Sequence, residues 1–199
     1  MSGAGPDLAG PDLAGAALLI IDLQLAVDDP SWAVDGPRNN PQAEVQVAAL
    51  AAGWRARGAP IFHIRHDSIE PHSTYYPGAP GHAFKPEGEP HPGEPVIAKH
   101  AHSAFVGTGL EVRLRRMEVR RLVVCGVITN NSVEATVRHG ADLGFDIVLA
   151  QDACFTFARR DARGTLWAAE DVHALSLANL AGEYCQVSTT EALLAHLAA

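Results

Sequence analysis

Three side chains with complementary chemistry follow short apolar segments of this sequence. Asp22 ends the run Leu-Leu-Ile-Ile, Lys99 follows Val-Ile-Ala, and Ser132 follows Gly-Val-Ile-Thr-Asn-Asn. A carboxylate can take the proton of a nucleophile, while a cation holds the nucleophile and its substrate in place. An aspartate at a strand end is by itself more often a cap or turn residue, so it is the combination that predicts nucleophilic hydrolysis.

The chain between these residues is typical of alternating strands and helices. Most apolar runs lack alternation, as expected for parallel strands covered on both faces. If six strands have the order 3-2-1-4-5-6, the ends of the first, third and fourth face one crevice, where open α/β sheets bind ligands. We expect strands at 16–22, 60–65, 95–98, 121–126, 145–150 and 184–187, and helices at 42–57, 109–117, 132–143, 168–180 and 189–197.

Composition limits the class of protein. The 199 residues, 47% of them hydrophobic, suit one domain with a single core. A repeated Pro-Asp-Leu-Ala-Gly at 6–10 and 11–15 predicts a flexible tail over residues 1–15, followed by a domain at 16–199. The net charge of −8, with acidic residues scattered, argues against a nucleic-acid partner and favours a small-molecule substrate.

Neither a membrane span nor a disulfide framework is expected. The longest apolar run, residues 14–21, is far shorter than the roughly 20 residues that a membrane helix needs. Cys125, Cys154 and Cys185 give an odd count without C-x-x-C spacing, which argues against disulfides and structural zinc. We therefore expect a cytoplasmic protein without membrane contact.

The segment from Leu122 to Arg138 resembles the isochorismatase-like (cysteine hydrolase) superfamily, which includes relatives of nicotinamidase and N-carbamoylsarcosine amidase. That superfamily has a Gly-Val-x-Thr-x-x-Cys-Val-x-x-Thr-x-Arg pattern, which this chain matches except at position 132, where it has serine. Asp-Leu-Gln at 22–24 and Lys99 followed by Ser-Ala-Phe at 103–105 match two further motifs. The resemblance extends from Ala16 to the C-terminus.

This resemblance implies a Rossmann-like three-layer fold and hydrolysis of C–N bonds in small amides, ureides or lactams. It assigns Asp22 as general base, Lys99 as the orienting cation and position 132 as the nucleophile, with no cofactor. It also implies a cis peptide bond between Val127 and Ile128, with the backbone amides of Ile128 and Ser132 binding the oxyanion. Position 132 is expected to begin a helix, whose positive end favours an oxyanion or a thiolate.

Serine at position 132 departs from the superfamily. A thiol ionises readily beside a cation, whereas a serine hydroxyl is a much weaker acid and normally needs a nearby histidine base. Three explanations are open: an introduced Cys-to-Ser change that inactivates the enzyme, a natural serine variant, or a member without covalent catalysis. We favour the first.

The substrate pocket is expected to draw residues from several loops. The stretch 67–94 is rich in proline and glycine, and we predict either a substrate-enclosing loop or, as the alternative, a surface Ω-loop or an oligomer contact. Within the pocket we expect eight side chains, namely Gln24, His66, Asp67, Tyr75, Phe84, Phe105, Thr129 and Phe155.

The histidines and the oligomeric state leave alternatives. His63, His66 and Asp67 do not match the Asp-x-His spacing of nicotinamidase metal sites, so we expect no metal. His102 is expected in a loop or at the surface, and His173 in packing or at an interface. The resemblance implies a homodimer or homotetramer.

Two other functions stay open: vinyl ether hydrolysis of the isochorismatase type without a covalent nucleophile, and a catalytically silent binding or oligomer-forming module.

Overall fold

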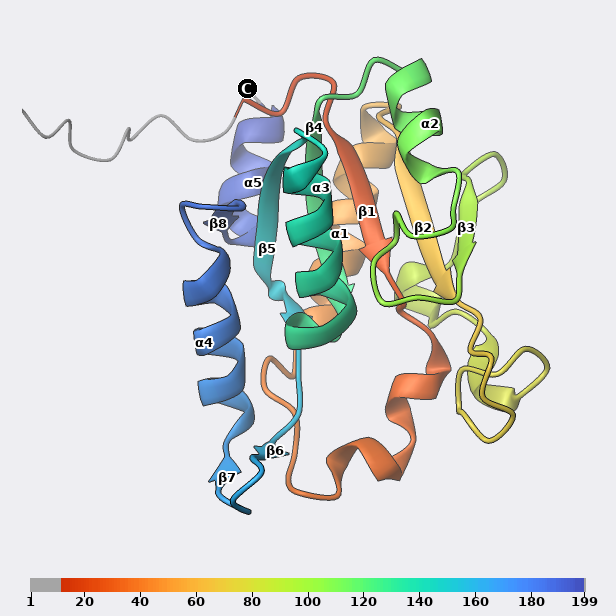
Figure 1. The fold of residues 1–199 in the computed structure, drawn as a ribbon. Coiled ribbons are helices and arrows are strands. Elements are labelled where there is room, and N and C mark those ends of the chain that lie inside the picture. Colours follow the sequence, from red (N-terminus) through yellow and green to blue (C-terminus); the bar gives the residue numbers. More distant parts are fainter. Residues whose placement is uncertain (1–11, 199) are drawn as a thin grey trace, which may run out of the picture.

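The computed structural model describes residues 12–198, with side chains to residue 197, and these form a three-layer α/β fold (Figure 1). The predicted tail lies outside the described residues from 1 to 11. Residues 12–15 form a turn that places Leu13 in the core. The strands are β1 (Ala17–Ile21), β2 (Ile61–His66), β3 (Val96–Lys99), β4 (Arg121–Val127), β5 (Asp146–Phe155), β6 (Arg159–Arg160), β7 (Leu166–Trp167) and β8 (Gln186–Ser188).

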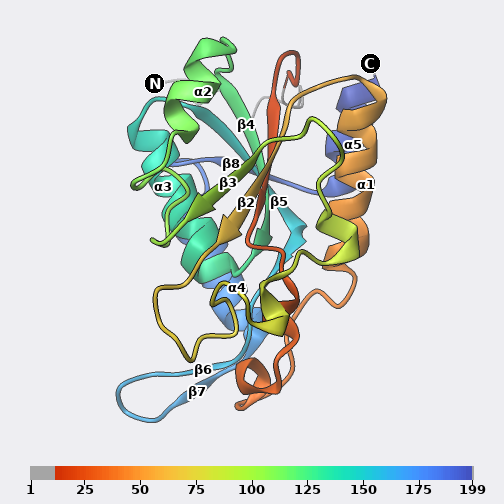
Figure 2. The same cartoon turned by 90° about the vertical axis from the view of Figure 1, so that its right-hand side faces the viewer.

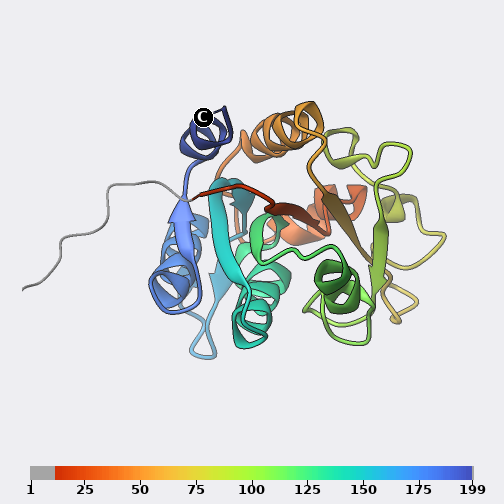
Figure 3. The same cartoon turned by 90° about the horizontal axis from the view of Figure 1, so that it is seen from above.

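Five α-helices and several shorter turns connect the strands. The helices are α1 (Ala43–Ala56), α2 (Leu110–Arg116), α3 (Glu134–Asp142), α4 (Ala169–Leu180) and α5 (Thr190–Ala198). Short 3-10 turns occupy Leu25–Asp28, Pro30–Ala33, Pro80–His82 and Pro86–Gly88, and a π-type turn occupies Thr129–Val133. Seen from above, α1 and α5 cover one face of the sheet, and α2, α3 and α4 cover the other (Figure 3).

The main sheet has the order β3-β2-β1-β4-β5-β8, and all its pairs are parallel. This is the predicted order, with β8 as the sixth strand, and the prediction is confirmed. Every residue of β1 is buried because helices cover both faces of the strand. The loops that follow the strands gather at the lower edge, where the β6–β7 hairpin also projects (Figure 2).

Two parts of the C-terminal half differ from the expected elements. β5 extends to Phe155 instead of ending at residue 150, and its pairing with β4 shifts between Val124 and Gly126. The Asn40 side-chain amide donates to the carbonyls of Gln151 and Cys154 at 2.9 and 2.7 Å, which holds the irregular part of β5 in place. The β6–β7 hairpin was not predicted because its strands are only two residues long.

Gly126 allows β4 to approach β1 closely, directly before the segment that carries Ser132. Its φ is +112°, and a Cβ there would lie 2.2 Å from the carbonyl oxygen of Ile21. Ile21 precedes Asp22, so the absence of a side chain at Gly126 brings two of the predicted site segments together.

We expect Gly126→Ala to lower the free energy of unfolding by about 3 kcal/mol or more, because it adds a backbone clash to the cost of a positive φ. Gly144→Ala is the matched control, since Gly144 has φ +82° but nothing within 4 Å of its would-be Cβ. Its expected loss is about 1 kcal/mol. Urea unfolding monitored by circular dichroism measures both, and equal losses would contradict the role given to the close approach.

Candidate active site

Lys99 joins the three predicted residues at the carboxyl ends of β1, β3 and β4. Its Nζ donates to Asp22 Oδ2 at 2.6 Å, to Ser132 Oγ at 3.3 Å and to the Ala101 carbonyl at 3.0 Å. The parallel register places these groups together, because β1 lies between β2 and β4 while β3 pairs with β2. The structure therefore brings Asp22, Lys99 and Ser132 into contact.

Asp22 is buried and keeps one oxygen without a hydrogen-bond partner among the described residues. Oδ2 accepts from Lys99, while Oδ1 has none. Burial raises the pKa of the Asp22 carboxyl above its ordinary value, and the charge of Lys99 opposes that shift without cancelling it. The backbone of Asp22 has φ +49°, in the left-handed region that aspartate tolerates better than most residues. A buried carboxylate with a free oxygen and a raised pKa is suited to accept a proton.

His66 is a further contact of Lys99. Its Nδ1 lies 3.4 Å from Lys99 Nζ, and its ring packs edge-on against Tyr75 with ring centroids 5.6 Å apart. Burial, and then the charge of Lys99, lower the pKa of His66 to about 4. The imidazole is therefore neutral at neutral pH, with Nδ1 placed to accept from Lys99.

A cavity of about 160 Å³ opens beside Asp22 and Ser132. Trp32 and Tyr75 form part of its wall, with their rings edge to face and centroids 6.2 Å apart. This is smaller than the roughly 300–1,000 Å³ of pockets for drug-sized ligands, so it suits a compact molecule, and its wall combines aromatic, imidazole and backbone groups. The cavity is lined by Asp22, Trp32, His66, Ser73, Tyr75, His102, Val127, Ile128, Asn131 and Ser132.

The turn before and around Ser132 is fixed by local hydrogen bonds. The peptide bond between Val127 and Ile128 is cis, as the resemblance implied. Thr136 Oγ1 donates to the Ser132 carbonyl at 2.7 Å and accepts from the Ala104 amide at 3.0 Å. The threonine that follows position 132 by four residues therefore holds the turn against the segment after Lys99. α3 begins at Glu134 rather than at position 132, because the π-type turn comes first.

Of the eight expected pocket residues, His66 and Tyr75 line this cavity. Three others lie in packing contacts: Phe105 stacks on Phe145, Phe155 lies beneath the guanidinium of Arg38, and the Thr129 hydroxyl contacts His173. Each of the three side chains is therefore used in packing against another segment, and none lines the cavity.

The remaining three expected residues support the loop. Gln24 donates to the carbonyls of His66 and His82 and accepts from the His66 amide, so it fixes the end of β2. Asp67 pairs with Arg65 and His82, and Phe84 packs edge-on against His63. These three side chains make hydrogen bonds, ion pairs or packing contacts with β2 and the loop after it, and none lines the cavity.

Four cavity residues were absent from the expected pocket, namely Trp32, Ser73, His102 and Asn131. Ser73 and Tyr75 come from the 67–94 stretch, which therefore contributes to the wall. His102 was expected in a loop or at the surface; it is an exposed loop residue that also borders the cavity. Only Asn131, beside position 132, had a signal in the sequence that could have predicted its place.

The described residues contain no group of three or more His, Cys, Asp or Glu side chains that could hold a metal ion. Cys125, Cys154 and Cys185 are free and buried, and burial raises the pKa of each thiol. Each therefore behaves as a small apolar side chain. No described helix is long and apolar enough to cross a membrane.

The fold and this cluster define a class of Rossmann-like α/β protein with a carboxylate, an ammonium group and a hydroxyl in contact at the crevice of the sheet. The isochorismatase domain family matches residues 16–192 of the chain. This chain belongs to the isochorismatase family.

Relatives and solved structures agree with this membership. The isochorismatase family protein YrdC of Bacillus subtilis is 38% identical over 178 residues, covering 89% of this chain and 94% of YrdC. A streptothricin hydrolase of Streptomyces noursei is 34% identical over 144 residues, covering 71% of this chain and 50% of that protein. A crystal structure of an isochorismatase-family protein from Chromobacterium violaceum has a TM-score of 0.88 and 61% identity, covering 92% of this chain and 93% of that one.

We expect Lys99→Met to destabilise the protein by about 3 kcal/mol near pH 8, because it leaves the Asp22 carboxylate buried without its cation. A carboxyl with a raised folded-state pKa binds protons more tightly in the folded than in the unfolded chain, whose value is about 3.9. Its contribution to stability therefore falls as pH rises between those two values. The loss should shrink near pH 5, where Asp22 in the variant can be protonated.

The double variant Lys99→Met with Asp22→Asn is the matched control, because a neutral amide needs no cation. Urea unfolding across this pH range should show a smaller, pH-independent loss for the double variant. An equal loss for the single and double variants at every pH would contradict the buried ion pair as the cause.

Proposed function

We propose that this chain is a hydrolase of C–N bonds in small amides, ureides or lactams, with Asp22, Lys99 and position 132 as its triad. The observation that carries the proposal is the contact of Lys99 Nζ with both Asp22 Oδ2 and Ser132 Oγ beside a cavity. Burying an ion pair carries a desolvation penalty, and perturbed carboxyl groups concentrate at functional sites. The streptothricin hydrolase relative supports a hydrolytic reaction.

In the proposed reaction, Asp22 takes the proton of the side chain at position 132 as that side chain attacks the carbonyl carbon. The C–N bond then breaks, and the proton passes from Asp22 to the leaving nitrogen. Water attacks the acyl intermediate, again giving its proton to Asp22, and the acid leaves as position 132 recovers its proton. The unpartnered Oδ1 of Asp22 supports its role as base.

We assign the backbone amides of Ile128 and Ser132 to the oxyanion. Both residues line the cavity beside Ser132 Oγ, so their amides are candidates to donate to the carbonyl oxygen as it becomes negative. Lys99 remains beside the nucleophile throughout and stabilises the charge that develops on it. The aromatic edges of Trp32 and Tyr75 favour a substrate with a flat or partly apolar portion.

Serine at position 132 is expected to leave this chain weakly active. The cation of Lys99 would lower the pKa of a thiol at position 132 and favour its thiolate, whereas a hydroxyl starts from a much higher pKa. His66 is neutral, but its Nδ1 faces Lys99, so it is occupied by that contact. We propose that the chain is the Cys-to-Ser form of a cysteine hydrolase.

Ser132→Cys should therefore gain activity. We expect ammonia or amine release from at least one compound in a panel of small amides, ureides and lactams, with kcat/KM at least about tenfold above that of the serine protein. Isochorismate is included in the panel. Hydrolysis of isochorismate alone would favour the vinyl ether reaction, and inactivity of both proteins would favour a silent module; either result contradicts the proposal.

Asp22→Asn in the Ser132→Cys background is the matched control, because asparagine keeps the shape and an acceptor for Lys99 but cannot take a proton. It should abolish turnover while the protein stays folded by circular dichroism. Full activity in this variant would remove Asp22 from the mechanism.

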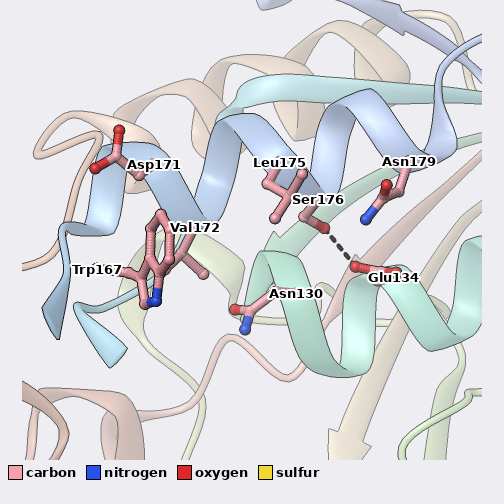
Figure 4. A pocket seen from close by; sticks show the side chains of 8 residues that line it. All are labelled: Asn130, Glu134, Trp167, Asp171, Val172, Leu175, Ser176 and Asn179. Carbon is pink, nitrogen blue, oxygen red and sulfur yellow. Dashed lines mark hydrogen bonds between the residues drawn. The ribbon is translucent and has the colours of Figure 1, made fainter. Parts of the chain in front are cut away.

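We also propose that the chain forms a homodimer or homotetramer in a cytoplasmic setting. Leu175 on α4 and Trp167 on β7 are 63% and 48% exposed, and they border a cavity of about 250 Å³ (Figure 4). Exposed acidic side chains at the start of α4 could pair with exposed arginines of the hairpin in a second copy, namely Glu170 and Asp171 with Arg159 and Arg163. Apolar area rimmed by charge is typical of an interface.

Light scattering after size-exclusion chromatography should give the mass of a dimer or tetramer. Leu175→Glu should reduce that mass to the monomer by burying a charge in the contact. Val112→Glu is the control, because Val112 on α2 is 53% exposed but lies on another helix. A monomeric starting protein, or dissociation by both variants alike, would contradict the α4 interface.

A further inference from the structure

The turn that carries Ser132 has a front, which borders the cavity, and a back, which faces the neighbouring elements. Thr129 and Asn130 are its two back residues. Thr129 Oγ1 lies 2.9 Å from Nδ1 of His173 on α4, and Asn130 Oδ1 accepts from Thr156 Oγ1 at 2.6 Å. The front consists of Val127, Ile128, Asn131 and Ser132, all of which line the cavity.

The contact between Thr129 and His173 is buried. Thr129 is 0% and His173 8% exposed. Burial lowers the pKa of His173, so its imidazole is neutral and carries one N–H, and a hydrogen bond with the backbone of Gln151 opposes the shift. A neutral imidazole has one ring nitrogen that donates and one that accepts, and a threonine hydroxyl can do either, so the contact forms with either tautomer.

We propose that His173 is a positioning residue for the candidate reaction: its Nδ1 hydrogen-bonds with the Thr129 hydroxyl and so holds the turn that places Ser132 and the Ile128 amide at the cavity. This proposal rests on the hydrolase function proposed above. His173 does not line the cavity, so it acts through Thr129 rather than on the substrate.

The turn needs such an anchor because its own hydrogen bonds are irregular. The Ile128 carbonyl accepts from the amides of both Asn131 and Val133, at 3.0 and 3.3 Å. Asn130 leaves the helical conformation, with φ −85° and ψ 17°. A wide turn of this kind tolerates small rotations, and displacements of about 1 Å at a reacting group reduce rates strongly.

A second polar contact from α4 provides a comparison. Ser176 Oγ donates to Glu134 Oε2 at 2.6 Å, across the groove that Figure 4 shows between α4 and α3. Glu134 lies beyond the turn, at the first residue of α3, and is not part of the cavity wall. Loss of this contact weakens the packing of α4 without releasing Thr129.

The test uses the Ser132→Cys protein and five further variants made in that background. Thr129→Val and His173→Leu each remove the contact, and each should lower kcat at least about tenfold with KM within about twofold, because transition-state placement is affected more than binding. The double variant Thr129→Val with His173→Leu should lower kcat no more than either single variant does. His173→Asn, whose amide group can take the place of Nδ1 as donor or acceptor, should recover most of kcat, and Ser176→Ala should leave kcat within about twofold.

A second readout needs no substrate. The thiol introduced by Ser132→Cys is alkylated with iodoacetamide across a pH series, and peptide mass separates it from the three buried native thiols. Thr129→Val and His173→Leu should move its apparent pKa by about half a unit or more, because the thiol moves relative to Lys99. Ser176→Ala should leave this value unchanged.

Unchanged kcat and an unchanged alkylation profile in a folded Thr129→Val protein would overturn the proposal, even if His173→Leu fails to fold. If the panel yields no substrate, the hydrolase proposal fails while the alkylation profile still decides whether His173 positions the turn. Equal losses from Ser176→Ala and His173→Leu would reduce His173 to a packing role.

Discussion

The buried ammonium group of Lys99 is the constraint on which the rest of the site depends. Lys99 is 1% exposed, so its three N–H donors must be satisfied inside the protein. Four acceptors surround it, namely Asp22 Oδ2, the Ala101 carbonyl, Ser132 Oγ and His66 Nδ1. The two longest contacts are those to Ser132 and His66. Lys99 can therefore shift a hydrogen bond from His66 to Ser132 while its contact with Asp22 stays in place. This suits a cation that stabilises negative charge as it develops on a nucleophile.

The fold brings these acceptors together by parallel pairing and close backbone approach. β1 and β4 carry Asp22 and the Ser132 turn side by side, and Gly126 allows their backbones to meet without a side chain between them. Gln24 fixes the end of β2, and with it His66. The reacting groups are thus held by the backbone of the sheet, and the turn is supported from behind by α4 and β5, so that few degrees of freedom remain at the cavity.

The sequence predicted the sheet order and the contact of Asp22, Lys99 and position 132, because residues directly after parallel strands meet at one edge whatever the loops do. It predicted the pocket wall less well. Phe105 and Phe155 are aromatic residues near the predicted site, so they were reasonable candidates for the wall. Whether an aromatic side chain faces a cavity or a neighbouring helix depends on packing that a local sequence pattern does not encode. Trp32, Ser73 and His102 reach the cavity from loops, whose course is set by contacts distant in sequence such as that of Asn40 with β5.

We propose that position 132 forms a covalent bond with the acyl group of an amide. Intact mass spectrometry of the Ser132→Cys protein, quenched at short times after mixing with the amide that it hydrolyses best, tests this directly. We expect a transient increase equal to the acyl mass, which peptide mapping places at position 132 and which disappears as substrate is exhausted. Steady turnover with an unchanged protein mass, in a quench fast enough to stop within one turnover, would contradict covalent catalysis, and an acyl group on another residue would contradict the assignment.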